Sequence, residues 1–317
     1  MARKRVLVCG ATGFIGRNMV EALASTSVWD VVGVYNRRPP FDFPGCKWVQ
    51  GDLTRPEDVE RCLDGVDIVI QAAAVTSGAK DIVNRPHIHV TDNAVMNSLI
   101  LRAAHDQGIS HVLFFSCSVM YPSSSDPLKE TDFDAGAEMN PNYFGAGWTK
   151  VYIEKMCEFY SRLGQTRFTV IRHSNTYGPY DKFDLERSHV FGATMTKVLR
   201  CADGEVVVWG DGSEERDLLH VSDLADFVKR AMVRQDTDFC LCNVGYGSTI
   251  SISGLVQKMI AASGKEIRIK YDLSRPTIKT RLALDCSRAR DLFGWERKIS
   301  LDEGIRKTMA WYLTNER

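Results

Sequence analysis

The sequence has no excess of charge of either sign, because forty Lys and Arg residues balance forty Asp and Glu residues in a chain of 317. Proteins that bind nucleic acid or a membrane surface need a large basic excess, so we expect neither partner. Long hydrophobic runs are also missing, since no stretch approaches the roughly 20 apolar residues of a membrane span. The apolar run at residues 6–9 is too short for a signal-peptide core, and we expect a cytoplasmic protein.

Cysteine shows no functional pattern. The nine cysteines are an odd number and form no Cys-x-x-Cys pair, which argues against a disulfide framework and against a structural metal site. We therefore expect reduced thiols and no bound metal. No Pro/Ser-rich linker, internal repeat or low-complexity segment divides the chain, so its parts should pack closely.

Short β-branched runs alternate with longer helix-like segments over the first two-thirds of the chain. This alternation is typical of right-handed βαβ units and predicts an α/β fold with a doubly wound parallel (Rossmann) sheet. The predicted strands are 6–8, 31–35, 48–50, 68–70, 112–115 and 168–171, and the predicted helices are 15–25, 56–63, 90–107 and 149–163.

The regular alternation of strands and helices ends at about residue 176, after which loops rich in Gly and Asp interrupt shorter elements. We predict a dinucleotide-binding domain over 1–176, to which 187–189 and 217–242 return. Most of 177–317, including a helix at 190–199 and a strand at 205–209, should form a smaller carboxyl-terminal substrate lobe. This lobe should cap the carboxyl edge of the sheet.

A glycine-rich turn follows the first strand and opens an amphipathic helix. Glycines spaced by three let the backbone approach a pyrophosphate, while the helix N-terminus presents unpaired N–H groups and a positive dipole end. A plain strand–helix turn is the alternative, but the context favours a dinucleotide site. The candidate cofactor residues are Gly10, Thr12, Gly13, Phe14, Ile15 and Gly16.

The second strand ends before Asn36-Arg37-Arg38, where an acidic residue would accept hydrogen bonds from the adenosine ribose. None is present, and the two guanidinium groups can pair with a 2′-phosphate instead. We therefore favour NADP over NAD as cofactor. The alternative is that Arg37 and Arg38 are solvated loop charges.

Further along, the sequence resembles the extended short-chain dehydrogenase/reductase family over essentially its whole length. The resemblance implies that Asp52 and Leu53 contact the adenine and that Ala72, Ala73 and Ala74 line the dinucleotide. Asn93 matches the family's structural Asn, and His173 should lie beside the nicotinamide. The segment 281–301, which starts at Arg281, looks like the closing helix-loop-helix over the nucleotide.

The family's catalytic helix carries Tyr-x-x-x-Lys, in which the Lys holds the nicotinamide ribose and lowers the phenol pKa. Lys150 matches the Lys, but Ala146 stands at the Tyr position. Counting back from Tyr121 puts Cys117 at the family's Ser/Thr position, with Ser118 as a possible substitute. Tyr143 is seven residues from Lys150, about 10.5 Å along a continuous helix. It is a poor replacement unless the helix begins after it and the loop folds inward.

The nucleotide-sugar branch of the family, and the GDP-fucose synthase group most closely, is similar in the segments 175–184, 188–190, 207–212 and 216–221. The resemblance implies that Asn175 forms the floor of the sugar site and that Lys197, Trp209 and Arg216 bind the diphosphate. Lys197 and Arg216 supply the cations that a diphosphate needs. Trp209 could instead be a core aromatic and Arg216 a loop charge. The remaining candidate substrate contacts are Ser118, Val119, His189 and Arg281.

His189 falls on the group's acid/base His, whereas Val119 falls on its catalytic Cys. His189 is therefore the best remaining acid/base, with His173 and Cys117 as weaker candidates and a packing or capping role as the alternative.

These features predict an NAD(P)-dependent epimerase or dehydrogenase/reductase that acts on a nucleoside-diphosphate hexose, preferably a GDP-sugar, in polysaccharide biosynthesis. A second hypothesis is an epimerase that oxidises its substrate only transiently. Because of Ala146, the alternative is a catalytically silent or engineered-inactive protein that binds the same ligands. The family precedent suggests a homodimer through the helices at 90–107 and 149–163.

Overall fold

The computed structural model describes residues 3–76, 79–185, 188–275, 277 and 280–316. Every structural statement below concerns these residues.

The larger part of the molecule is built on a seven-stranded sheet in the order β10-β6-β5-β4-β1-β2-β3, and every neighbouring pair runs parallel. This arrangement confirms the predicted doubly wound parallel sheet. Its strands are β1 Arg5–Cys9, β2 Asp30–Tyr35, β3 Cys46–Gln50, β4 Ile68–Gln71, β5 His111–Phe115, β6 Arg167–His173 and β10 Phe239–Val244.

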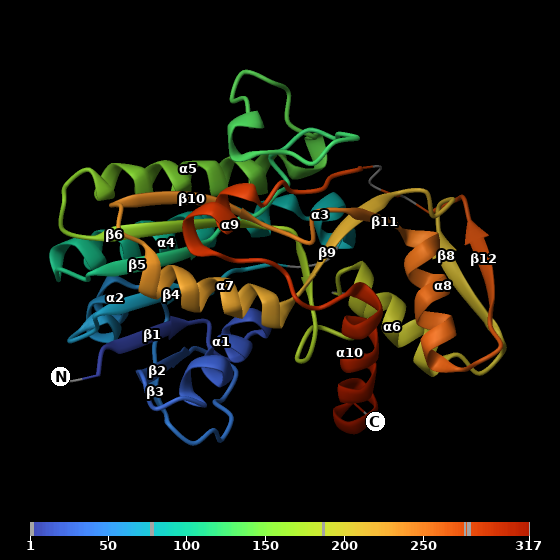
Figure 1. Ribbon diagram of the computed structural model, residues 1–317, viewed down its shortest axis with the longest axis horizontal. Helices are drawn as coiled ribbons and strands as arrows, with labels where there is room; N and C mark the ends of the chain where they lie inside the picture. The colour runs from blue at the N-terminus through green and yellow to red at the C-terminus, as the bar shows by residue number, and fades with distance from the viewer. Residues whose placement is uncertain (1–2, 77–78, 186–187, 276, 278–279, 317) are drawn as a thin grey trace.

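Helices cover both faces of this sheet (Figure 1). Side chains alternate along a strand, so Val6 and Val8 of β1 join one hydrophobic cluster while Leu7 and Cys9 join the other. The first cluster includes helices α1 Phe14–Ala24, α7 Val221–Arg234 and α9 Ser287–Phe293, together with Trp295. The second includes α2 Pro56–Leu63, α4 Thr91–Asp106 and α5 Phe144–Ser161.

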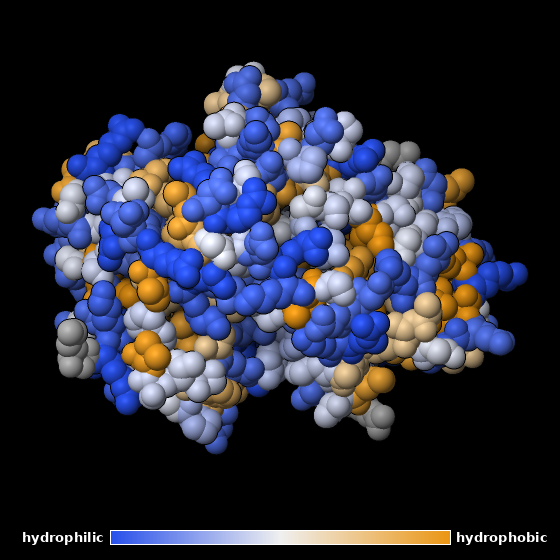
Figure 2. Space-filling view, viewed as in Figure 1, coloured by the Kyte–Doolittle hydropathy of each residue, from blue (hydrophilic) through white to orange (hydrophobic). Residues whose placement is uncertain are grey.

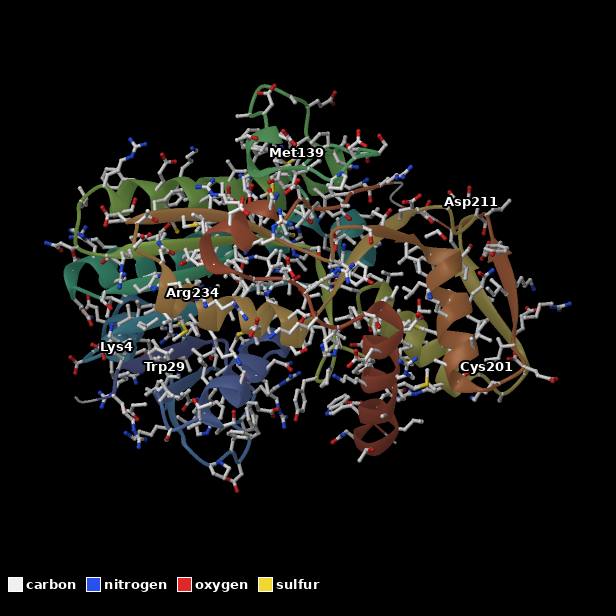
Figure 3. All side chains as sticks on the ribbon, in the orientation of Figure 1. Lys4, Trp29, Met139, Cys201, Asp211 and Arg234 are labelled. Carbon is white, nitrogen blue, oxygen red and sulfur yellow. The ribbon has the colours of Figure 1, made fainter. Side chains whose placement is uncertain are left out.

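A smaller lobe lies beside the sheet and has its own hydrophobic cluster (Figure 1). It contains helices α6 Val190–Arg200, α8 Ile252–Ser263 and α10 Leu301–Asn315 and the parallel pair β8 Glu205–Trp209 and β12 Arg268–Asp272. A three-stranded sheet, β11 Thr249–Ser251, β9 Glu215–His220 and β7 Asn175–Tyr177, joins the lobe to the rest. Figure 3 shows the two ends of the molecule, with Lys4 and Trp29 near the edge of the large sheet and Cys201 and Asp211 in the lobe.

Short elements fill the connections between the main helices and strands. They are α3 Ala79–Asn84 and the 3₁₀ helices η1 Pro86–His89, η2 Glu130–Asp132 and η3 Pro141–Tyr143.

The predicted start of the catalytic helix at residue 149 is wrong, because α5 begins at Phe144. Its first turn contains two glycines, which are poor helix formers and conceal the helix in the sequence. The packing explains Gly147, since a Cβ there would lie 2.3 Å from Met139 Sδ. Lys150 and Ala146 therefore share one helix.

The surface is mixed in character. Figure 2 shows hydrophilic and hydrophobic residues interspersed over the visible face. Among the described residues, no helix combines the length and apolar character needed to cross a bilayer.

Candidate active site at the reversal of strand order

The strand order reverses between β1 and β4, and the glycine turn after β1 faces the start of the loop after β4 at that point. In doubly wound sheets, ligands bind in the crevice at such a reversal. Gly10 has φ +66°, and a Cβ there would lie 2.7 Å from Ala73 Cα. A Cβ at Gly16 would lie 2.2 Å from Gly10 O. Both positions therefore require glycine so that strand, turn and helix can pack closely.

The turn also leaves room for an anion. Gly13 is the N-cap of α1, no side chain caps the helix, and its first turn holds no acidic residue. A Cβ at Gly13 would have only Gly10 O within 4 Å, at 3.2 Å, so the space beside it is open. Uncapped N–H groups and the positive dipole end suit a diphosphate, and the residues fit a dinucleotide.

A cation lies against this turn. Arg38, just beyond β2, donates from Nη1 to the carbonyl oxygen of Thr12 at 3.1 Å and remains exposed. Arg37 is exposed as well, and the backbone of Asn36 accepts a hydrogen bond from Gln50. Positive charge therefore lies at the end of β2, beside the glycine turn.

Two further predicted cofactor residues make well-defined local contacts. Asp52 accepts hydrogen bonds from the backbone and hydroxyl of Thr54, which lower its pKa. Leu53 is buried. Asn93 pairs with Val75 through Oδ1 and Nδ2, each at 2.9 Å, and so fixes the loop that follows β4.

A loop from the segment 175–184, which the resemblance to the nucleotide-sugar branch assigned to the sugar site, packs over the same turn. Asn18 of α1 donates to the carbonyl oxygen of Pro179 at 2.9 Å, and the Arg17 guanidinium lies 3.7 Å from the Tyr180 ring centroid. Lys182 Nζ donates to Thr76 O at 2.8 Å. These contacts tie the 178–184 loop to both sides of the strand reversal.

Lys150 lies at the carboxyl end of β5. Its Nζ donates to Phe115 O at 2.7 Å and lies 4.6 Å from the Phe114 ring centroid. Burial lowers the pKa of this amine, and Cys117 is close enough for the two groups to interact electrostatically. Burial raises the pKa of Cys117, so it is a neutral thiol at pH 7. Ser118 is buried and Val119 half-buried on the same segment.

Two histidines lie beside this group. The His173 ring meets the Phe115 ring edge-on at 5.9 Å, and its Nδ1 contacts Ser174 O at 2.8 Å. Burial lowers the pKa of His173 to about 4, helped by Lys150 and His189. His189 is the exposed N-cap residue of α6. Part of the residue reaches the surface, yet desolvation by the protein packed around the ring, aided by the charge of Lys182, lowers its pKa, so the imidazole is neutral at pH 7.

Tyr143 lies at the start of the helix that carries Lys150. Ala146 occupies the first turn of α5, one turn before Lys150. Tyr143 ends η3 just before the helix, and its side chain is half-buried within electrostatic reach of Cys117 and Arg216. The helix therefore begins after Tyr143, and the Tyr143 side chain is only partly exposed.

The predicted diphosphate residues form a second group in the lobe. Lys197 Nζ donates to Val207 O at 2.9 Å and lies 5.6 Å from the Trp209 ring centroid. Arg275, which the sequence did not suggest because no motif surrounds it, lies 5.5 Å from the same centroid. Trp209 is 39% exposed, so it is not a core aromatic.

The other predicted substrate residues line β7, β9 and the segment beside them. Arg216 Nη1 donates to Thr280 Oγ1 at 2.8 Å. Arg281 pairs with Glu215 at 3.2 Å, and Asn175 Nδ2 lies 3.4 Å from Asp217 O. Arg216 is the residue of this group that also reaches the surroundings of Tyr143.

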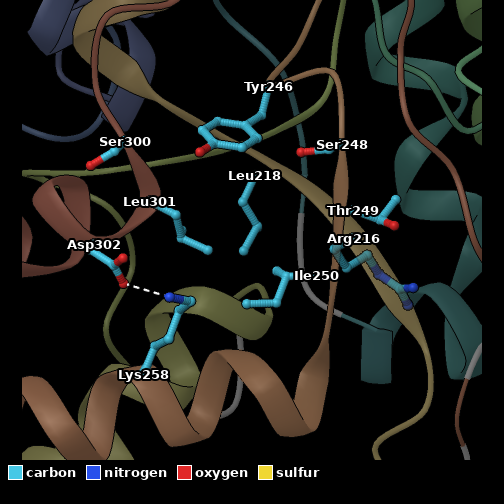
Figure 4. A pocket seen from close by; sticks show the side chains of 10 residues that line it. All are labelled: Arg216, Leu218, Tyr246, Ser248, Thr249, Ile250, Lys258, Ser300, Leu301 and Asp302. Carbon is cyan, nitrogen blue, oxygen red and sulfur yellow. Dashed lines mark hydrogen bonds and ion pairs between the residues drawn. The ribbon is translucent and has the colours of Figure 1, made fainter.

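A pocket of about 220 Å³ opens on the lobe side of β9 (Figure 4). Leu218, Ile250 and Leu301 form its apolar centre, and the ion pair between Lys258 and Asp302 closes one side. Of the predicted site residues, only Arg216 lines it. This pocket is therefore separate from the group around Lys150.

A buried polar network supports the floor of the site, and no motif in the sequence indicates it. Arg172 of β6 binds Glu154 of α5 through Nε at 3.0 Å and Nη2 at 2.6 Å. Ser116 donates to the same carboxylate, and Arg172 Nη1 donates to the hydroxyl of Tyr121 at 2.8 Å. The ion pair is almost inaccessible and lies one helical turn beyond Lys150.

Comparison with known proteins agrees with this geometry. Residues 6–245 match the model of the NAD dependent epimerase/dehydratase family. A "Putative GDP-L-fucose synthase 2" of Arabidopsis thaliana is 32% identical over 98% of this chain and 92% of the relative. A "GDP-L-fucose synthase" of Azorhizobium caulinodans is 29% identical over 98% of this chain and 97% of the relative.

A solved structure shows the same fold. The UDP-glucose 4-epimerase of Thermotoga maritima, solved with UDP-glucose, has a TM-score of 0.87 and 24% identity and covers 99% of this chain and 100% of its own. At that identity the likeness concerns the fold alone.

Proposed function

Because the chain belongs to the NAD dependent epimerase/dehydratase family, we propose that it modifies the sugar ring of a nucleoside-diphosphate hexose, with a GDP-sugar as the preferred substrate. The observation that carries this proposal is the grouping of Lys150, Cys117, His173 and Tyr143 at the carboxyl edge of the parallel sheet, the same edge that carries the glycine turn. The names of the relatives, both GDP-L-fucose synthases, support the choice of base.

We propose NADP as the cofactor, with NAD as the alternative. The N-terminus of α1 would hold the diphosphate and Arg38 the 2′-phosphate, because an exposed guanidinium already lies against the turn. When bound, the nicotinamide ring gives or takes a hydride. Lys150, now donating to Phe115 O, would exchange that partner for a ribose hydroxyl.

The sugar nucleotide would lie across the cleft from the cofactor, against the lobe formed by most of residues 177–317. Trp209 offers an exposed ring for stacking, and Lys197 and Arg216 offer charge for the diphosphate. Cys117 and Ser118 would contact the sugar hydroxyls. His189 is neutral at pH 7, so it can accept a proton from a sugar carbon beside a carbonyl group.

Two copies of the chain would pair through α4 and α5. Tyr152 and Phe159 are seven residues apart, which places them on one side of α5, and Leu163 follows the end of the helix; all three are exposed. Val95 of α4 is exposed as well. A second copy would remove these side chains from water.

A panel of GDP-, UDP-, CDP- and dTDP-hexoses, including their 4-keto-6-deoxy forms, tests the proposal. Absorbance at 340 nm reports net redox change, and mass spectrometry or NMR of the product reports epimerisation without it. We expect turnover with a GDP-sugar and NADPH, and Lys150→Met should weaken cofactor binding and slow turnover. Binding of the nucleotide sugar and cofactor without any product would instead identify a catalytically silent protein.

A further inference from the structure

We propose that the phenol of Tyr143 is the catalytic proton donor to the sugar, although it lies three residues before the position where the family has its tyrosine. This inference rests on the proposed function and assigns a residue to its proton-transfer step. It starts from the backbone that precedes α5.

The chain turns before the helix begins. Asn140 Oδ1 accepts a hydrogen bond from Asn142 N at 3.0 Å, and Tyr143 N donates to Asn140 O at 2.8 Å. Tyr143 has φ −106° and ψ 2°, and helical geometry starts with Phe144. Tyr143 is therefore the N-cap residue of α5. The rise of about 10.5 Å to Lys150 remains, and the non-helical backbone changes the direction in which the Tyr143 side chain leaves the helix.

The side chain of Tyr143 turns inward while that of its neighbour turns outward. Phe144 is 60% exposed, whereas Tyr143 is half-buried. Tyr143 interacts electrostatically with Cys117, beyond the end of β5, and with Arg216 on β9. Both residues are assigned above to contacts with the sugar nucleotide, so Tyr143 lies on the sugar side of the proposed site.

The hydroxyl of Tyr143 is available to a ligand. It makes no hydrogen bond with the described residues, and it is not among the polar atoms sealed from solvent. The unpaired hydroxyl forgoes a hydrogen bond worth about 0.5–1.5 kcal/mol. A ligand atom can supply that bond without breaking one within the protein. An oxygen atom of the sugar is the partner that this position offers.

The surroundings favour donation of a proton. Burial raises the pKa of Tyr143 despite the opposing charge of Arg216, so the phenol keeps its proton at pH 7. The neutral imidazole of His189 has no proton to spare as an acid but can accept one. The two residues would divide the work, with His189 as acceptor and Tyr143 as donor.

With Tyr143 as proton donor, the catalysed step is the reduction of a keto sugar. As the carbonyl carbon takes up hydride from reduced nicotinamide, the π electron pair moves to the carbonyl oxygen. The Oη–H bond of Tyr143 breaks, its proton forms the new sugar hydroxyl, and the resulting phenolate takes a proton from water. Arg216, within electrostatic reach, stabilises the transient negative charge.

Substitution tests the donor directly. Tyr143→Phe should lower kcat by about 100-fold or more, the usual contribution of a positioned general acid, while the Kd for the GDP-sugar changes little. Tyr160→Phe removes a phenol near the other end of the same helix, where it packs on His105, and should leave kcat unchanged. If the Tyr143→Phe enzyme turns over as fast as the wild type, Tyr143 is not the proton donor, and the proposed function still stands.

A second measurement does not depend on turnover. With 3-fluorotyrosine at position 143, the ¹⁹F resonance should shift when GDP-sugar and NADP bind together, and the same label at position 160 should not respond. The fluorinated phenol is more acidic, so the alkaline limb of the kcat–pH profile should also move to lower pH. A resonance at position 143 that ignores both ligands would refute the inference, whether or not a substrate has been found.

Discussion

The buried ion pair between Glu154 and Arg172 provides the sharpest test of how the fold supports the site. The two side chains are 5% and 3% exposed and are joined by three hydrogen bonds. Ser116 also donates to the carboxylate. Glu154→Gln keeps the shape of the side chain but leaves the Arg172 charge in the interior without a counter-ion.

The expected loss of stability is about 3–5 kcal/mol, because an uncompensated buried charge costs more than the pair contributed. Tyr121 and the carbonyl oxygen of Glu130 also accept hydrogen bonds from Arg172, so the guanidinium keeps some partners and the lower half of that range applies. The midpoint of thermal unfolding should fall by about 5 °C, because the unfolding entropy of a chain of 317 residues is about 0.7 kcal/mol/K.

Glu158→Gln is the matched control on the same helix. Glu158 pairs with Lys155 and Arg162, whose side chains are each 73% exposed. Surface pairs of this kind contribute at most about 1 kcal/mol. Urea unfolding of both variants measures the difference, and equal losses in the two would refute the assignment of Glu154 as the buried partner of Arg172.

Three further predictions address the cofactor, one buried histidine and the proposed dimer. Arg38→Ala should weaken NADPH binding about tenfold, or ~1.4 kcal/mol, and leave NADH binding unchanged. Fluorescence titration measures both affinities. Equal effects on NADPH and NADH would show that Arg38 does not bind the 2′-phosphate. Burial lowers the pKa of His111 to about 3, so the unfolded chain binds more protons between pH 6.5 and 3 and stability falls as pH falls through that window. The slope should be about 1.4 kcal/mol per pH unit, and urea melts of His111→Gln should show it reduced; an unchanged slope would contradict the assignment. Tyr152→Asp with Phe159→Asp should give a monomer in light scattering with secondary structure retained, whereas a wild-type chain that is itself monomeric would exclude the proposed pairing.

The strands were well predicted because hydrophobic runs in a doubly wound sheet are short, buried on both faces and bounded by polar residues. All six predicted strands of the large sheet are present. The start of α5 was missed because Gly145 and Gly147 oppose helix formation locally. Close packing against Val90 and Met139 requires them there, and no local signal in the sequence shows which distant side chain will approach.

The candidate site divides in the same way. Gly10 and Lys150 belong to motifs whose spacing follows the geometry of a turn or a helix, so the sequence reveals them. Arg275 and Glu154 depend on contacts between distant segments, which spacing along the chain does not encode. Helical spacing from Lys150 disfavours Tyr143, because spacing does not show which way a side chain points at a non-helical N-cap residue.

Neighbouring residues on β9 connect the sugar side of the site to the closing segment of the chain. Side chains alternate along a strand, so Arg216 and Asp217 point to opposite sides of β9. Asp217 is buried and accepts hydrogen bonds from the backbone of Tyr246, Gly247 and Leu284, at 2.7, 3.0 and 3.1 Å. Those bonds fix the strand that carries Arg216 against the loop after β10 and the segment before α9. Arg216 therefore has a firmly held backbone, which is the condition for one guanidinium to serve both a diphosphate and the charge that develops beside Tyr143.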